Sequence, residues 1–179
     1  QNEKVISEIN QVPLNKLKGW SLCDDAIRHN SGKFFSIDGI EINTNYRNVH
    51  NWSQPIINQP EIGFLGIITK KISGVLHFLM QAKIEPGNLN IVQLSPTLQA
   101  TRSNYTRVHN GESPKYLEYF TGEKKVEILV DQLQSEQGAR FLQKRNRNII
   151  VRVPDEEILC QYEEFIWLTI KQIKDLLNY

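Results

Sequence analysis

The sequence predicts an α+β fold with a mixed, largely antiparallel sheet and few helices. Three observations lead to this prediction. Apolar and polar residues alternate through much of the region 74–101, as is typical of half-buried strands. Short turn signals separate the strand-like segments, as is typical of a sheet built from consecutive strands. The clearest helix signal comes at the C-terminus, where a capping residue precedes an apolar stripe with helical spacing.

The first third of the chain predicts a helix, a hairpin and a loop. Apolar residues between positions 3 and 17 have roughly helical spacing, and Pro13 must end that helix. Residues 33–43 are typical of a hairpin in which an Asp-Gly pair joins two short strands. Residues 44–61 show little periodicity, so we expect a long loop there, and long loops in compact domains are often functional.

The central segment predicts consecutive strands with one polar face. We expect strands at 62–69 and 74–84, joined by a turn at 70–73, and a third strand at 92–101 after a Pro-Gly-Asn turn. If the last two strands pair antiparallel in the right register, their polar side chains form one patch. Its members would be Gln81, Lys83, Glu85, Gln93, Ser95, Thr97, Gln99 and Thr101.

Two interpretations of this patch remain open. Uncharged amides and hydroxyls suit a hydroxyl-rich ligand such as a sugar, whereas a merely solvated strand face usually carries Lys and Glu. Antiparallel sheets also often leave one face in water, and Lys83 with Glu85 would then be an ordinary surface pair. Pro96 argues for an edge or a bulge in the third strand, a geometry common next to sites.

The C-terminal part predicts an irregular polar segment followed by short elements. Residues 102–121 hold several tyrosines and a histidine, and a strand is expected at 126–130. A short helix is predicted at 135–143 and another strand at 148–153. Thr169, with a glutamine three residues later, begins the final helix.

Composition describes one ordinary globular domain. The chain has 179 residues and a net charge of +1, so no overall field recruits nucleic acid or an anionic membrane. No apolar run approaches the length of a membrane span. Two isolated cysteines without ligand spacing suggest a reducing compartment, and the polar N-terminus does not resemble a signal peptide. We therefore expect a single domain, residues 1–179, in a cytoplasmic protein.

Local constellations allow more than one function. The sequence lacks the phosphate-binding, dinucleotide, zinc-protease and esterase motifs, and its four histidines are scattered, which disfavours a metal site. Trp52 could stack on a base or a sugar, or simply anchor its loop. The basic run Arg140, Lys144, Arg145 and Arg147 could be a solvated helix end or a phosphate site.

Several motifs together resemble the NDP-hexose 2,3-dehydratase family of deoxysugar biosynthesis. They occur in the family's order and cover nearly the whole chain: RHNSGKFF (28–35), NWSQPIINQPEIGFLG (51–66), LMQAKIEPGN (79–88), QLSPTLQATRSNYTRVHNG (93–111), SEQGARFLQKRNRN (135–148) and FIWLTIKQI (165–173). The resemblance implies a Nudix-like fold without Nudix chemistry. The Glu-rich helix that holds magnesium in Nudix hydrolases is missing, which disfavours pyrophosphate hydrolysis.

The resemblance also implies a substrate and an assembly. Family members act on a dTDP-linked 4-keto-6-deoxy sugar and remove water across C2 and C3 without a redox cofactor or a metal. The family's usual chain holds two copies of this module, whereas this sequence holds one. A homodimer would restore the pair of modules, and the alternative is a catalytically silent nucleotide-sugar-binding module that partners another deoxysugar enzyme.

Roles carried over from the resemblance remain hypotheses at this point. Glu85 is the candidate base for the C3 proton, with Lys83 or Tyr105 as donor to the enolate oxygen and Tyr105 or His109 as the acid that helps the C2 hydroxyl leave. Expected substrate contacts are Trp52, Gln54, Glu61, Gln81, Gln99, Thr101, Asn104, Arg107, Arg145 and Arg147. Of these, Arg107, Arg145 and Arg147 are expected at the diphosphate, and Glu61 is an alternative carboxylate.

Overall fold

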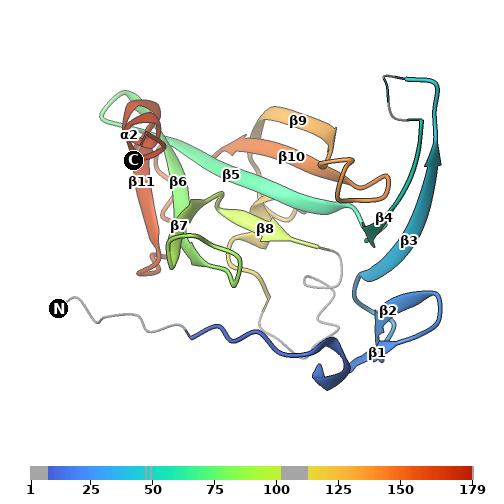
Figure 1. The fold of residues 1–179 in the computed structure, drawn as a ribbon. Helices are drawn as coiled ribbons and strands as arrows, with labels where there is room; N and C mark the ends of the chain where they lie inside the picture. Colours follow the sequence, from blue (N-terminus) through green and yellow to red (C-terminus); the bar gives the residue numbers. More distant parts are fainter. Residues whose placement is uncertain (1–7, 47, 49, 102–112, 179) are drawn as a thin grey trace.

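The computed structural model describes residues 8–46, 48, 50–101 and 113–178, which form two sheets and one α-helix (Figure 1). The small sheet has the order β1-β2-β3-β4, with bounds Trp20–Leu22, Ala26–His29, Ser36–Asn43 and Asn51–Asn58. The large sheet has the order β11-β6-β5-β10-β9, and β7 and β8 add to β6 and β5. This arrangement confirms the predicted α+β class with largely antiparallel pairing.

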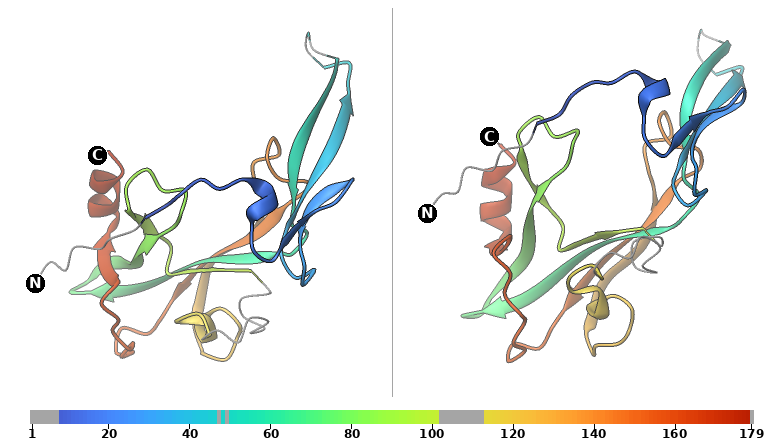
Figure 2. Two further views of the ribbon diagram at one scale, coloured as in Figure 1. Left: turned by 60° about the horizontal axis from the view of Figure 1, so that its bottom comes forward. Right: turned by 90° about the horizontal axis from the view of Figure 1, so that it is seen from below.

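The large sheet contains seven strands in the described part of the chain. They are β5 (Gly63–Ile72), β6 (Val75–Ile84), β7 (Val92–Ser95), β8 (Leu98–Ala100), β9 (Glu127–Ser135), β10 (Arg145–Arg152) and β11 (Phe165–Thr169). Only β10 runs parallel to its neighbour β5; the other pairs are antiparallel. Figure 2 shows the small sheet standing at one end of the large sheet and α2 (Ile170–Leu176) at the other.

The β5–β6 hairpin is tighter than the sequence suggested. Ser73 and Gly74 both have positive φ, 51° and 80°, which is the backbone of a two-residue type I′ turn. The strands therefore extend to Ile72 and begin again at Val75, where the expected turn covered four residues.

A fork in the large sheet divides the predicted third strand in two. Residues before Pro96 pair with β6, and residues after Thr97 pair with β5 at Leu65 and its neighbours. Thr97, which is 2% exposed, lies between them. Its hydroxyl donates to the Leu79 carbonyl oxygen and accepts from the Ile68 amide at 3.0 Å. Thr97 therefore belongs to the sheet and not to a ligand-facing row.

The core lies on one face of the large sheet. Ile68, Leu79 and Val151 are buried there against Tyr119 and Phe120, which belong to the segment around η2 (Leu117–Tyr119). Figure 2 shows this segment lying across the sheet. The close approach requires glycine at position 66, because an added Cβ would meet the Phe120 ring at 2.4 Å.

The prediction for residues 33–61 is wrong in two places. The Asp-Gly pair lies inside β3, which runs straight through because it pairs with β2 on one side and β4 on the other. Residues 51–58 are strand β4 and not part of a long loop. One face of β4 is exposed and the other is partly buried around Ile56, but that inner face also carries Gln54 and Asn58, so the sequence contains no apolar alternation that would reveal the strand.

Two predicted helices are also wrong, and one is confirmed. Residues 8–13 form no helix, and only a 3-10 turn, η1, follows at Leu14–Lys16. Residues 136–144 form the hairpin connection between β9 and β10, because strand pairing of their flanks overrides local helix propensity. The C-terminal helix is present with the expected capping box at Thr169. No helix in the described part of the chain is long and apolar enough to cross a membrane.

The edge of the large sheet carries exposed apolar side chains. Strand β9 is exposed along its whole length, with Ile128 at 55% and Leu133 at 47%. In the described part of the chain β9 pairs only with β10, so its outer edge has no neighbouring strand.

The fork yields a prediction about stability. Thr97→Val keeps the shape of the side chain but removes the hydroxyl that satisfies the Ile68 amide and the Leu79 carbonyl. We expect the free energy of unfolding, measured by urea denaturation, to fall by about 2–4 kcal/mol, since each unsatisfied buried group costs about 1–3 kcal/mol. Thr121→Val is the control, because the Thr121 side chain is exposed and its loss should change stability by less than about 0.5 kcal/mol. Equal effects of the two substitutions would show that the hydroxyl does not hold the fork.

Candidate functional site

A pocket of about 270 Å³ lies where the fork opens, beside the ends of β5, β8 and β10. Its walls include four residues that the sequence predicted for the site: Lys83, Glu85, Gln99 and Thr101. The other lining residues are Gln59, Gly63, Phe64, Leu65, Ala100, Glu136, Phe141, Lys144 and Asn146. We call this the fork pocket.

Lys83 is the centre of the polar contacts on one wall of the fork pocket. Its Nζ lies 3.2 Å from Glu85 Oε1 and donates to Gln99 Oε1 at 3.1 Å. The hydroxyl of Ser95 lies 3.5 Å from the same Gln99 oxygen. Strands β6 and β7 pair with Lys83 opposite Gln93 and Gln81 opposite Ser95, so the two polar faces do merge as the alternation predicted.

The opposite wall carries polar residues that the sequence analysis did not select for the site. Lys144 is 4% exposed and Asn146 is 9% exposed. The Lys144 ammonium donates to the Glu61 carbonyl oxygen. The Asn146 amide donates to Glu136 Oε1, while its Oδ1 accepts from the Gly63 amide at 3.2 Å. Burial lowers the pKa of Lys144, and the charges of Glu61 and Glu136 partly oppose this.

The sequence contained one signal for this wall. Lys144, Asn146 and Asn148 alternate with Arg145 and Arg147, which is the period of a strand and not of a helix end. Reading the run as a strand would have separated the two groups onto opposite faces. The four cations favoured an interpretation by charge, as a helix end or a phosphate site, whereas the alternation indicates the strand β10.

Two of the three arginines expected at the diphosphate, Arg145 and Arg147, lie outside the fork pocket. Arg147 is engaged by Asp131 through two hydrogen bonds of 2.7 and 2.6 Å, and its guanidinium lies 5.5 Å from the centre of the Phe64 ring. The hydrogen bond and charge of Asp131 raise the pKa of Arg147. Arg145 lines a neighbouring cavity of about 630 Å³ that shares Glu136, Phe141 and Lys144 with the fork pocket.

Other predicted contacts are more scattered. Trp52 and Gln54 lie on β4, where the Trp52 indole donates to Gln54 at 2.9 Å and Gln54 donates to the Ala139 carbonyl oxygen at 2.8 Å; neither lines the fork pocket. Gln81 is on β6 but does not line the pocket either. Glu61 lines an adjoining cavity of about 350 Å³, formed with residues 32–35 and sharing Gln59 and Thr101 with the fork pocket.

Four predicted residues cannot be placed. Asn104, Tyr105, Arg107 and His109 lie outside the described residues. Their proposed roles therefore stay predictions. Thr101, the last described residue before them, lines the fork pocket.

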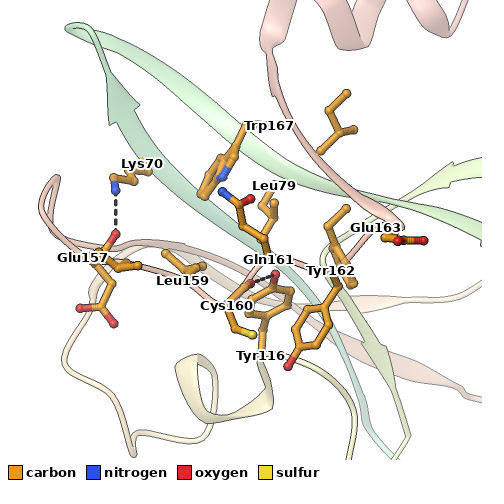
Figure 3. A pocket seen from close by; sticks show the side chains of 13 residues that line it. Lys70, Leu79, Tyr116, Glu157, Leu159, Cys160, Gln161, Tyr162, Glu163 and Trp167 are labelled. Carbon is orange, nitrogen blue, oxygen red and sulfur yellow. Dashed lines mark hydrogen bonds between the residues drawn. The ribbon is translucent and has the colours of Figure 1, made fainter.

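A larger cavity, of about 710 Å³, contains none of the predicted residues (Figure 3). It lies between the end of the large sheet and residues 157–163, and its walls include Trp167, Tyr162 and Tyr116. The Tyr116 hydroxyl donates to the Cys160 carbonyl oxygen at 2.6 Å, and burial raises the pKa of Tyr116 to about 12. Lys70 crosses the cavity to the Glu157 carbonyl oxygen at 2.6 Å (Figure 3). Protein groups thus already satisfy two of its polar side chains.

The described residues contain no group of three or more His, Cys, Asp or Glu side chains placed to hold a metal ion. The fork pocket instead combines two ammonium groups, two carboxylates and several amides. Such a set can donate hydrogen bonds to ketone and hydroxyl oxygens, and its carboxylates can accept hydrogen bonds from hydroxyl groups.

Comparison with solved structures gives weak likenesses. A C. elegans Ap4A hydrolase aligns with a TM-score of 0.40 and 11% identity, over 68% of this chain and 89% of that one. The T. brucei MERS1 protein aligns with a TM-score of 0.37 and 12% identity, over 66% and 61% of the two chains. The expectation of a Nudix-like arrangement continues to rest on the family resemblance.

Comparison with known sequences is decisive about the family. Three proteins named dTDP-4-dehydro-6-deoxy-alpha-D-glucopyranose 2,3-dehydratase match almost the whole chain. They come from Saccharopolyspora spinosa (49% identity over 96% of this chain), Amycolatopsis orientalis (45% over 97%) and Streptomyces violaceoruber (47% over 95%). This chain spans only 35%, 38% and 39% of their respective lengths. The family model for NDP-hexose 2,3-dehydratase matches residues 1–179, and the chain therefore belongs to that family.

Proposed function

We propose that this chain is a dehydratase module that removes water across C2 and C3 of a dTDP-linked 4-keto-6-deoxyhexose. The observation that carries the proposal is the fork pocket, where the Glu85 carboxylate and the Lys83 ammonium lie together beside Gln99 and Thr101. The relatives that match the chain are named for this reaction on a dTDP-linked sugar.

The chemistry needs a base, an oxyanion donor and an acid. The C3 proton is acidic because it lies next to the C4 ketone, so a base can take it and leave an enolate. The enolate then re-forms the ketone as the C2–O bond breaks, and an acid gives the departing hydroxide a proton to make water. The resulting C2=C3 enol tautomerises to a 3,4-diketone.

Glu85 is the base in this proposal. It is the predicted carboxylate that lines the fork pocket, and its partner Lys83 fixes its position at 3.2 Å. Glu136 also lines the pocket, but its Oε1 accepts from the Asn146 amide. Tyr105 and His109 remain the candidates for the acid.

The size of the fork pocket suits the sugar and not the whole substrate. Pockets that enclose drug-sized ligands have volumes of about 300–1,000 Å³, and the fork pocket has about 270 Å³. The nucleotide would extend into one of the two adjoining cavities, lined by Arg145 on one side and by Lys33 with Glu61 on the other.

We also propose that two copies of the chain associate. The family resemblance implies paired modules, and a homodimer would supply two modules to one assembly. The same implied pairing allows a second candidate function, a nucleotide-sugar-binding module that partners another deoxysugar enzyme without catalysing the reaction itself.

One assay separates these functions. Purified protein is incubated with dTDP-4-keto-6-deoxyglucose, and mass spectrometry follows the sugar nucleotide. Loss of one water supports the dehydratase. Measurable binding of an unchanged substrate supports the silent module and contradicts the catalytic proposal.

Glu85→Gln tests the base. Because glutamine keeps the size of the side chain but cannot accept the C3 proton, we expect the dehydration rate to fall by a factor of about 10²–10⁴. Glu163→Gln is the matched control, since Glu163 is exposed and lines the larger cavity. A Glu85→Gln protein that is folded and dehydrates at the normal rate would show that the base is another group.

Molar mass tests the assembly. Light scattering coupled to gel filtration should give twice the mass of the 20.8 kDa chain. The expected dimer should persist across a tenfold dilution if it is the working form. A protein that remains a monomer while it dehydrates the substrate would contradict the need for two modules.

A further inference from the structure

Lys144 is a buried cation at the junction of two cavities. Its side chain lines both the fork pocket and the neighbouring cavity of about 630 Å³, yet only 4% of the residue is exposed. Lysine is seldom buried to this degree without a charged partner. The position therefore needs a physical explanation.

The contacts of Lys144 compensate its charge only in part. Among the described residues, its ammonium makes one hydrogen bond, to the Glu61 carbonyl oxygen, and no carboxylate lies within ion-pair distance. The Glu136 carboxylate is nearby, but Asn146 donates to it. An ammonium has three protons to donate, so two remain for a ligand.

Burying such a group is costly, and an apolar side chain of similar length would avoid the cost. The desolvated state is also what lowers the pKa of Lys144. A buried ionisable group that lines two cavities is a candidate for function. In a site of low dielectric, a fixed cation stabilises a developing negative charge far better than it does in water.

We propose that Lys144 donates to the C4 oxygen of the substrate and stabilises the enolate. This inference rests on the dehydratase function proposed above. In the step concerned, the C3–H electron pair forms the C3=C4 bond, the proton passes to Glu85, and the C4=O pair moves onto oxygen, where the Lys144 ammonium donates to it. The pair returns when the C2–O bond breaks, and Lys144 keeps its proton throughout.

Lys83 is less suited to donate to the enolate oxygen, although it was a candidate for this role from the sequence. Its ammonium pairs with Glu85 at 3.2 Å and donates to Gln99 at 3.1 Å, and its side chain is 27% exposed. Its charge is thus partly neutralised and partly hydrated. We assign it the placement of the Glu85 carboxylate.

The experiment measures enolate formation and the overall dehydration separately, on the intact protein. Deuterium uptake at C3 from D₂O reports enolate formation, and loss of water reports the whole reaction. For Lys144→Met we expect both rates to fall by a factor of about 10²–10³, with KM changed little. Lys70→Met is the matched control, because Lys70 also donates to a backbone carbonyl but lies in the cavity of Figure 3.

The outcomes separate this inference from the proposed function. A folded Lys144→Met protein with normal C3 exchange would overturn the role of Lys144 and leave the dehydratase intact. A raised KM with unchanged kcat would also overturn it, since it would place Lys144 at the diphosphate. A wild-type protein that neither exchanges nor dehydrates would overturn the dehydratase proposal and this one together.

The pH profile gives a second readout that does not depend on the methionine variant folding. The charged groups around Lys144 are Glu61, Glu136, Lys83 and Glu85. Loss of the Lys144 proton should slow C3 exchange on the alkaline side, at a pH below the 10.5 of free lysine because its pKa is lowered. In Lys144→Arg the guanidinium stays charged, so that alkaline limb should move to higher pH; an unmoved limb would overturn the proposal.

Thermal stability should move opposite to activity. Because the buried ammonium is costly, Lys144→Met should raise Tm by about 2–4 °C at neutral pH. With a folded-state pKa below 10.5, the cost is fully present below that pKa and fades as the pH rises toward 10.5. The gain in Tm should therefore shrink in alkaline buffer. A Tm that falls and a C3 exchange rate that persists would identify Lys144 as a structural residue.

Discussion

The fork at Thr97 is the constraint on which the rest of the large sheet depends. One edge of β5 can pair with only one strand at each position, and here it is shared between β6 and β8. The hydroxyl of Thr97 bonds to a backbone group of each main strand where they separate. Without that bridge, two buried peptide groups would have no partner at the point of divergence.

The site follows from the same fork. Because β6 leaves β5, Lys83 and Glu85 are carried away from the plane of β5, and Gln99 is carried along it on β8. The hydrogen bond from Lys83 to Gln99 spans the space between them. The other wall comes from the hairpin 136–144 and the start of β10, which reach the same space from the other side of β5. The pocket is therefore bounded by strands whose relative positions are set by backbone pairing.

Local pattern was enough to predict the strands in the middle of the chain and their shared polar face. Alternation placed Lys83 and Gln93 on one face correctly, and the capping pair at Thr169 and Gln172 was correct in detail. The pattern failed where apolar residues do not mark the buried face. The partly buried face of β4 carries Gln54 and Asn58 beside Ile56, so no periodicity marked this strand, and the pairing of β9 with β10 decides the 136–144 hairpin. The burial of Lys144 could not be read from the sequence either, because it depends on a loop carbonyl at Glu61, eighty-three residues away.

The outer edge of β9 has a consequence for how the chain behaves during folding and handling. Among the described residues no strand pairs with this edge, and with Ile128 and Leu133 exposed it is a template for further strand pairing. Its charged side chains, Glu127 and Asp131, are held by Arg152 and Arg147 of the same sheet and so repel an incoming strand less than free carboxylates would. We therefore expect concentrated preparations of the isolated chain to self-associate through this edge of β9 unless another surface covers the strand.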